Sequence, residues 1–204
     1  MHPVIHELTE RYPALSVCAE EIQSTADLLV GVFRAGCKLL LCGNGGSAAD
    51  CDHIAAEFLK SFKHPRPLPP EIRERLGPEM ASQLEGGLPA IPLPLFTGLL
   101  TAYQNDRNGV HGFAQLTLAM GKPGDAFLGL STSGNAANVI AAARTAQSIG
   151  LQVVGLTGET GGDLEQYCHR CIRVPGMEVE HIQELHLPVY HTLCKAVESI
   201  FFGD

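Results

Sequence analysis

One pattern constrains the fold of this chain more than any other: an apolar run, then a loop of Gly and Ser residues, then a helical stretch. The first copy is residues 38–42 followed by Gly43-Asn-Gly-Gly-Ser47, and the second is residues 126–130 followed by Ser131-Thr-Ser-Gly-Asn135. Uninterrupted apolar strands that alternate with helices are typical of a parallel sheet covered on both faces. The sequence therefore predicts an open, layered α/β fold.

The other elements continue this alternation. Residues 151–156 form a third apolar run, which ends at a Gly-rich loop over 157–162, and residues 91–95 indicate one more short strand. Apolar residues at helical spacing predict helices over 15–35, from the first loop to about Phe62, and over 97–103, 110–120, 136–149 and 178–202. Pro188 lies inside the last of these, where a proline removes one backbone hydrogen bond and kinks a helix unless its neighbours compensate.

A Pro-rich insertion over about residues 64–90 interrupts the pattern. Eight of the 13 prolines fall between His64 and Pro94, around a short charged segment. A loop this long is usually functional or mobile, so we interpret it as a lid, a subunit contact or a tolerated insertion. With 204 residues, the chain is expected to form one domain over 1–204 that includes this insertion.

Charge and cysteine content restrict the class of partner. The 14 Lys and Arg against 22 Asp and Glu give a net charge of −8, the wrong sign for binding nucleic acid or an acidic membrane surface. No apolar run reaches the roughly 18 residues of a membrane span, and the N-terminus lacks a signal-peptide pattern. Seven cysteines, an odd number with a single CxxC at Cys168 and Cys171, favour reduced, buried thiols. We therefore expect a cytoplasmic protein that binds neither nucleic acid nor membrane.

The two Gly/Ser loops are candidate anion sites. Each lies between a strand and the first turn of a helix, where free backbone N–H groups and Ser or Thr hydroxyls can bind a phosphate. Neither loop has the Gly-Lys-Ser/Thr ending of a nucleotide-binding P-loop or the GxGxxG fingerprint. The alternative is that Ser47, and Ser133 or Asn135, merely cap helices. Because both loops fall at the C-terminal ends of strands, where open α/β sheets bind ligands, we favour an oxyanion ligand.

His53 and Glu57 form a candidate reactive pair. At a spacing of i, i+4 they project from one face of the helix that follows the first loop. His53 lies six residues after Ser47, less than two helical turns or about 9 Å of rise. Such a pair can bind a metal ion, or supply a carboxylate base held by an imidazole. It can equally be a solvated helix pair.

The last helix contributes Gln183, His186 and His191. Either histidine could be a buried, hydrogen-bonded residue or a ligand. Gln183 and His186 are neighbours at i, i+3, whereas Gln183 and His191 lie about 12 Å apart along an ideal helix. Spacing alone therefore leaves open which of these residues act together.

Taken jointly, the motifs resemble a known family. Cys42-Gly-Asn-Gly-Gly-Ser-Ala-Ala-Asp50 with His53 and Glu57, then Asn105-Asp106, Gly129-Leu-Ser-Thr-Ser-Gly-Asn135, and Ile182-Gln-Glu-Leu-His186 with His191, are similar to phosphoheptose isomerases of the sugar isomerase (SIS) superfamily. The resemblance implies a SIS-domain three-layer sandwich, with a five-stranded parallel sheet flanked by helices. It also implies a homotetramer whose active sites lie at subunit interfaces.

The resemblance further implies a reaction and a set of site residues. The reaction interconverts sedoheptulose 7-phosphate and D-glycero-D-manno-heptose 7-phosphate through an enediol, with Glu57 acting at C1 and His191 at C2. One zinc ion per subunit would be bound by His53, Glu57, Gln183 and His191. The substrate and its phosphate would contact Asn44, Gly45, Gly46, Ser47, Asp106, Ser131, Thr132, Ser133, Asn135 and Gln183.

Two positions depart from the family pattern. Ser61 stands where an arginine is frequent, and Ala136 stands where a serine is common, so two groups that bind anions are missing. Lys60 or Arg66 could compensate. The alternatives are an isomerase of another ketose phosphate, or a non-catalytic SIS protein that binds a sugar phosphate or a protein partner. A non-catalytic member is expected to lose the acid/base pair, which this chain keeps at Glu57 and His191.

Overall fold

The computed structural model describes residues 1–203 and contains a five-stranded parallel sheet in the order β2-β1-β3-β4-β5. The first loop follows β1 and the second follows β3, and these two strands are paired neighbours at the centre of the sheet. Both loops therefore lie at the same edge of the sheet. The predicted α/β class is confirmed. The strands are β1 (Leu39–Cys42), β2 (Ala90–Pro92), β3 (Ala126–Ser131), β4 (Gln152–Thr157) and β5 (Arg170–Arg173).

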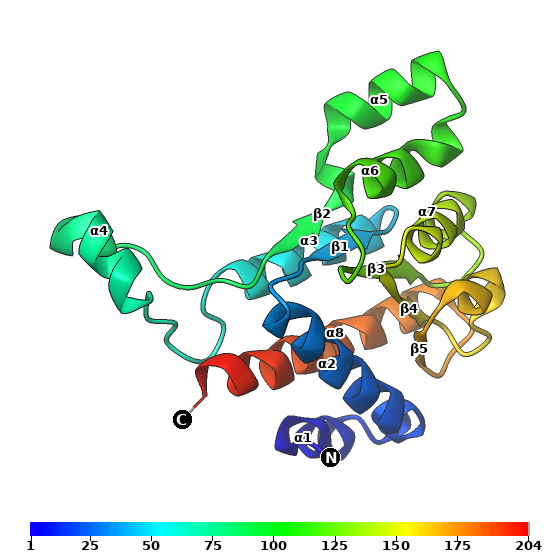
Figure 1. Cartoon of the computed structure of the whole chain (residues 1–204). Helices are drawn as coiled ribbons and strands as arrows, with labels where there is room; N and C mark the ends of the chain where they lie inside the picture. The colour runs from blue at the N-terminus through cyan, green and yellow to red at the C-terminus, as the bar shows by residue number, and fades with distance from the viewer. Residues whose placement is uncertain (204) are drawn as a thin grey trace.

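Helices cover both faces of this sheet (Figure 1). In β1, Leu39 and Leu41 belong to one apolar core, while Leu40 and Cys42 belong to a second core on the opposite face. Because side chains alternate across a strand, a strand buried on both faces must be apolar at every position. The first core is shared with α1, α2, α3 and α8, and the second with α6 and α7.

The predicted helices are present in the predicted order with shifted bounds, and two further helices accompany them. They are α1 (Pro3–Arg11), α2 (Ala19–Arg34), α3 (Gly46–Leu59), α4 (Pro70–Ala81), α5 (Thr97–Asp106), α6 (Gly112–Met120), α7 (Ala137–Ser148) and α8 (Val179–Phe202). Short 3-10 turns cover Pro13–Cys18, Leu93–Leu95, Gly109–His111 and Gly162–Tyr167. Pro188 lies inside α8 without dividing it.

Several boundaries differ from the predictions. The helix expected over 15–35 is preceded by a 3-10 turn that begins at Pro13, and α2 itself begins at Ala19. The strand expected over 91–95 changes into a 3-10 turn at Leu93, next to Pro94. Helices α1 and α4 and strand β5 were not predicted. Strand β5 lies at the edge of the sheet, so Arg170 and Arg173 remain exposed and the apolar run is too short to be recognised.

The Pro-rich insertion leaves the body of the molecule and carries α4, which extends to one side in Figure 1. No residue of α4 is buried, and Gly77 (φ 75°) breaks its helical geometry before Pro78. The two arms of the insertion are joined by a backbone bond from the Gly86 N–H to the Arg66 carbonyl, and the Leu88 N–H donates to the Phe58 carbonyl of α3. The insertion is therefore anchored at its base only.

A buried ion pair provides that anchor. The Arg66 guanidinium donates from Nε and Nη2 to Glu198 Oε1 on α8, and both side chains are fully buried. It also donates to the Glu57 and Phe58 carbonyls at the end of α3. The other oxygen of Glu198 accepts from the Lys63 backbone. Arg66 thus fixes the C-terminal end of α3 against α8.

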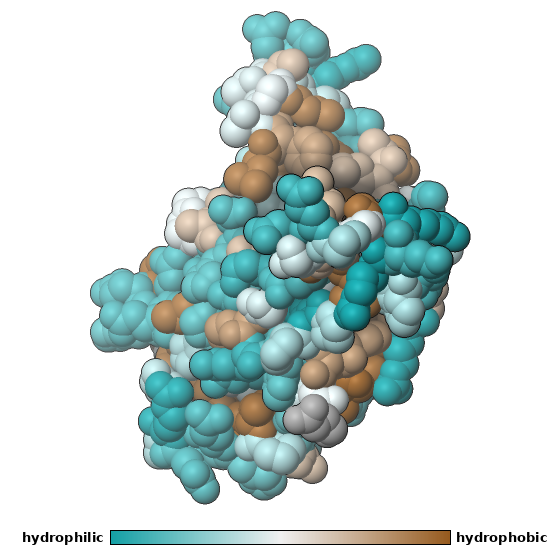
Figure 2. Space-filling model, turned by 90° about the vertical axis from the view of Figure 1, so that its left-hand side faces the viewer, coloured by the Kyte–Doolittle hydropathy of each residue, from teal (hydrophilic) through white to brown (hydrophobic). Residues whose placement is uncertain are grey.

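Hydrophobic side chains gather on one part of the outer surface. Figure 2 shows them in the upper part of the molecule, below a hydrophilic tip, where α5 and α6 lie in Figure 1. The large apolar residues exposed in this region are Leu95, Phe96, Val110 and Leu118. None of the helices within residues 1–203 is both long and apolar enough to cross a membrane.

Candidate active site

The first Gly/Ser loop opens onto the N-terminus of α3. Gly45 has φ 54°, a conformation that favours glycine, and a Cβ at Gly43 would lie 2.8 Å from the Ser47 carbonyl oxygen. No side chain caps the helix at Gly45, and Ser47 is buried in the first turn. The interpretation of Ser47 as a simple N-cap is therefore wrong. The exposed loop leaves the first N–H groups of α3 open to an anion.

The second loop begins with Ser131 at the end of β3. Ser131 is buried, whereas Ser133 and Asn135 are exposed. The Ser133 hydroxyl accepts from the Asn135 N–H, and the Asn135 side chain accepts from the Asp163 N–H. The N-cap residue of α7 is Ala136, which makes no side-chain cap, so neither Ser133 nor Asn135 caps the helix. Thr132, Ser133 and Asn135 line a cavity of about 170 Å³.

Two asparagines join the loops. Asn44 in the first loop and Asn138 in the first turn of α7 exchange two amide hydrogen bonds, of 2.9 and 2.8 Å. This pair brings the open ends of α3 and α7 together, as a shared phosphate would require. Asn138 was missed in the sequence analysis because an asparagine in the first turn of a helix is an ordinary residue there.

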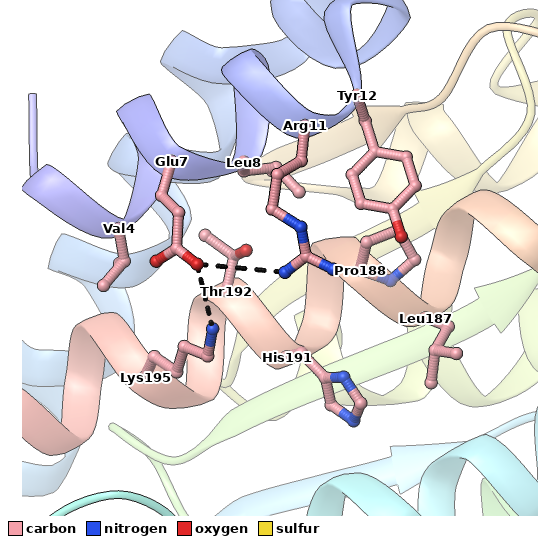
Figure 3. A pocket seen from close by; sticks show the side chains of 10 residues that line it. All are labelled: Val4, Glu7, Leu8, Arg11, Tyr12, Leu187, Pro188, His191, Thr192 and Lys195. Carbon is pink, nitrogen blue, oxygen red and sulfur yellow. Dashed lines mark ion pairs between the residues drawn. The ribbon is translucent and has the colours of Figure 1, made fainter.

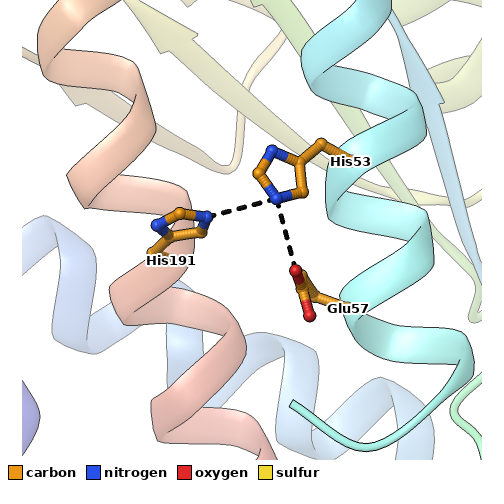
Figure 4. Close-up of side chains that lie close together, drawn as sticks. All are labelled: His53, Glu57 and His191. Atoms are coloured by element: carbon orange, nitrogen blue, oxygen red, sulfur yellow. Dashed lines mark hydrogen bonds and ion pairs between the residues drawn. The ribbon is translucent and has the colours of Figure 1, made fainter.

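His53 and Glu57 on α3 meet His191 on α8 (Figure 4). His53 Nε2 lies 3.2 Å from Glu57 Oε1 and 3.4 Å from His191 Nε2, and one ligand atom from each residue falls within 4.8 Å of the others. The i, i+4 spacing did place His53 and Glu57 on one face. The structure adds His191, which spacing could not select.

The electrostatics of this cluster favour a cation between its members. Burial and the nearby His53 lower the pKa of His191, so its ring is neutral at neutral pH. Glu57 Oε2 is buried without a hydrogen-bond partner among residues 1–203, and the Lys60 ammonium lies 3.9 Å away. Two imidazole nitrogens and a carboxylate that face one point form a donor set suited to zinc. The residues present therefore fit a metal ion.

Gln183 and His186 occupy different surroundings. The Gln183 amide lies directly against Gly46, where only a residue without a side chain leaves room, and beside Asp50. It therefore sits on the first turn of α3, and its role as a metal ligand stays a prediction. His186 is fully buried, and burial lowers its pKa to about 4. The Thr157 backbone offsets part of this shift, although neither ring nitrogen makes a full hydrogen bond.

Sequence reasoning also missed Asp50 and Tyr190. The Tyr190 hydroxyl donates to Asp50 Oδ1 at 3.1 Å and lies 3.0 Å from His53 Nδ1. Burial and the Asp50 carboxylate raise the pKa of Tyr190, so the phenol keeps its proton. Nothing in the residue spacing shows that a tyrosine next to His191 points toward α3.

Three other predicted positions lie apart from the cluster. Asp106 is exposed at the end of α5, where it accepts a hydrogen bond from Asn105. Ser61 follows α3, and its N–H donates to Glu85. Arg66 is saturated by Glu198 and two carbonyls, so it cannot replace the missing arginine, whereas the Lys60 ammonium is exposed near Glu57.

A second cavity borders the cluster from the other side of α8 (Figure 3). It has a volume of about 190 Å³ between α1 and α8, and it includes His191. Glu7 occupies one side, with its carboxylate 3.8 Å from Arg11 and 3.9 Å from Lys195. None of the Gly/Ser-loop residues lines this cavity, so it is not the predicted phosphate site.

Comparisons with known proteins agree with this arrangement. The family model that matches the chain is the SIS domain, over residues 5–86 and 87–158. The phosphoheptose isomerase of Roseiflexus sp. is 44% identical over 186 residues, which cover 91% of this chain and 85% of that protein.

Two solved structures are also similar. The phosphoheptose isomerase of Neisseria gonorrhoeae superimposes with a TM-score of 0.77 at 31% identity, covering 96% of this chain and 93% of that one. The enzyme of Francisella tularensis gives a TM-score of 0.79 at 26% identity, covering 93% and 91%.

The fold and the paired loops thus define a SIS-domain protein of the sugar isomerase class. Within this class, the chain belongs to the phosphoheptose isomerase family.

Proposed function

We propose that this protein is an aldose–ketose isomerase that interconverts sedoheptulose 7-phosphate and D-glycero-D-manno-heptose 7-phosphate, in heptose biosynthesis for surface polysaccharide. The observation that carries the proposal is the meeting of Glu57 and His191 from facing helices, within 4.8 Å of each other. At this separation, a proton acceptor and a second proton-transfer group can act on two neighbouring carbon atoms of one sugar, such as C1 and C2. The relatives named phosphoheptose isomerase support the choice of substrate.

The two Gly/Ser loops would bind the phosphate. The backbone N–H groups at the starts of α3 and α7 receive no cap from the residue that precedes each helix, and the Asn44–Asn138 pair holds both starts together. Thr132 and Ser133 line the adjacent cavity and offer hydroxyl donors. Fixing the phosphate in this way would place the other end of the sugar along α3, toward His53 and Glu57.

Glu57 takes the proton from C1 of the ketose while the C2 carbonyl oxygen gains a proton, and an enediol forms. Oε1 of this carboxylate faces His53, and Oε2 has no hydrogen-bond partner among residues 1–203, which leaves an oxygen able to accept a proton. His191 exchanges the proton at C2, since its lowered pKa keeps the ring neutral. Return of a proton to C2, with loss of the O1 proton as the C1 carbonyl forms, gives the aldose.

A zinc ion belongs to this proposal, one per subunit. His53, Glu57 and His191 supply its donors, and Gln183 is the proposed fourth ligand. When bound, the ion supplies a positive charge that polarises the oxygens of the substrate.

The proposal extends to a homotetramer of one-domain subunits with interfacial sites. Apolar side chains are exposed around α5 and α6, as expected for a surface that another copy covers. Asp106, a proposed substrate contact, lies exposed on α5 away from the cluster of its own chain, which fits a contribution to a neighbouring site. The seven free cysteines support a cytoplasmic location.

Turnover on purified, zinc-loaded protein tests the proposal, with sedoheptulose 7-phosphate and a panel of other ketose phosphates. Aldose product from the heptulose is expected, and Glu57→Gln and His191→Ala should each lose about 10²- to 10⁴-fold. His6→Ala, an exposed histidine outside the site, should match the parent chain. No product from any ketose phosphate with zinc bound would contradict catalysis and favour a sugar-phosphate sensor.

A second candidate keeps the chemistry and changes the sugar. Ser61 and Ala136 lack the guanidinium and hydroxyl that the family pattern provides, and the buried Arg66 does not replace them. Turnover on a pentose or hexose phosphate alone, lost in the same two variants, would establish this alternative.

A further inference from the structure

Tyr190 connects the cluster to a carboxylate outside it. The tyrosine is 1% exposed on α8, immediately before His191, and its hydroxyl reaches across to α3. There it lies between Asp50 Oδ1, at 3.1 Å, and His53 Nδ1, at 3.0 Å. The other nitrogen of the His53 ring faces Glu57 and His191. The Tyr190 phenol thus lies between the Asp50 carboxylate and His53 Nδ1, the ring nitrogen that points away from the proposed metal position.

The three groups fix the direction of their hydrogen bonds. A phenol has one proton, and the Tyr190 hydroxyl donates it to Asp50 Oδ1. Its oxygen must then accept the proton of His53 Nδ1–H, since two acceptors at 3.0 Å would repel each other. His53 Nδ1 consequently carries a proton, and Nε2, which faces the Glu57 carboxylate at 3.2 Å, can present its lone pair to a cation placed between the two side chains.

We propose that Tyr190 is a positioning residue. Its hydroxyl links the Asp50 carboxylate to His53 Nδ1 by two hydrogen bonds, and this link orients the ring so that its Nε2 lone pair faces a metal ion shared with Glu57 and His191. The inference rests on the metal site of the proposed function. Ligating histidines generally donate their other N–H to such a partner, and loss of the partner typically weakens metal affinity by 10- to 100-fold. Here that partner is supplied through a phenol from the same helix as His191.

Two measurements on the full chain test this. Zinc affinity is measured by competition with a chromophoric chelator, and the His53 tautomer is read from ¹⁵N shifts of the ring in metal-free protein. For Tyr190→Phe, which removes only the hydroxyl, we expect zinc to bind about 10- to 100-fold more weakly and the Nδ1–H preference to disappear. Tyr167→Phe, in the opposite core, is the matched control and should change neither value.

The possible outcomes separate the two proposals. If the parent chain binds zinc and Tyr190→Phe binds it equally tightly with an unchanged His53 tautomer, the relay is wrong and the metal site stands. If the parent chain binds no zinc, the metal site fails, and the relay is still decided by whether Tyr190→Phe alters the tautomer. Should Tyr190→Phe not fold, Asp50→Asn replaces it, with a smaller loss of zinc affinity expected because the amide keeps an acceptor but loses the charge. An unchanged affinity and tautomer in Asp50→Asn would overturn the relay.

Discussion

Two groups of charged side chains join α3 to α8, and they are built in opposite ways. At the end of α3, Arg66 and Glu198 are fully buried, and each is surrounded by hydrogen-bond partners. In the middle of α3, the cluster of His53, Glu57 and His191 is partly exposed, and Glu57 Oε2 has no hydrogen-bond partner among residues 1–203. In the first group the charged atoms have their hydrogen bonds filled, so this saturated pair holds the fold. In the second group a carboxylate oxygen has no hydrogen-bond partner, so this unsaturated cluster can accept a ligand.

The largest expected effect comes from breaking the saturated pair. Glu198→Ala leaves the Arg66 guanidinium buried without its carboxylate, and should lower the free energy of unfolding by about 3 to 5 kcal/mol. Urea unfolding measures this change. The double variant Arg66→Met, Glu198→Leu is the control: it removes both buried charges and should lose less stability than Glu198→Ala, although backbone groups that the pair binds lose their partners. A small effect of Glu198→Ala alone would show that Arg66 reaches water.

His186 gives the next effect, through pH. Its folded pKa of about 4 lies below the unfolded value of 6.5, so its contribution to stability is present above pH 6.5 and is lost as pH falls toward 4. A shift of this size corresponds to about 3 kcal/mol. Unfolding free energies at pH 7 and pH 4.5 should differ less in His186→Leu than in the parent chain. An equal difference between the two pH values in both proteins would indicate that a hydrogen-bond acceptor stabilises protonated His186 in the folded state.

Much of this organisation could be predicted from the sequence, for a physical reason. The strands are buried on both faces, so their apolar runs are continuous, and the loops between them use glycines that the backbone requires. A helical spacing of four also places His53 beside Glu57. These are local properties, and local properties are visible in sequence.

The remainder depends on which helix faces lie opposite each other. His191 meets His53 across 138 positions of the chain, and Arg66 meets Glu198 across 132. No periodicity selects such partners, and for that reason only the family resemblance had placed His191 in the metal site. Edge strand β5 was not predicted because only Ile172 of its four residues is buried, so it has no continuous apolar run.

Zinc should act on the unsaturated cluster and not on the saturated pair. A ligand that binds the folded state alone stabilises it by about 2.7 kcal/mol at 100 times its dissociation constant. We therefore expect added zinc to raise the melting temperature of the parent chain, and a chelator to reverse the rise. The increase should vanish in His191→Ala and persist in His6→Ala. Equal stabilisation of both variants would mean that zinc binds elsewhere.

The smallest effect concerns the link between the two loops. Asn138→Ala removes both amide bonds to Asn44, which are exposed, and should cost about 1 kcal/mol of stability. Its larger consequence falls on binding, because the start of α7 is then free to move relative to the start of α3. If both helices share the phosphate, the variant should raise KM for the sugar phosphate while kcat changes little. A drop in kcat with constant KM would contradict this role in phosphate binding. It would mean that the Asn44–Asn138 pair positions the reacting end of the sugar instead.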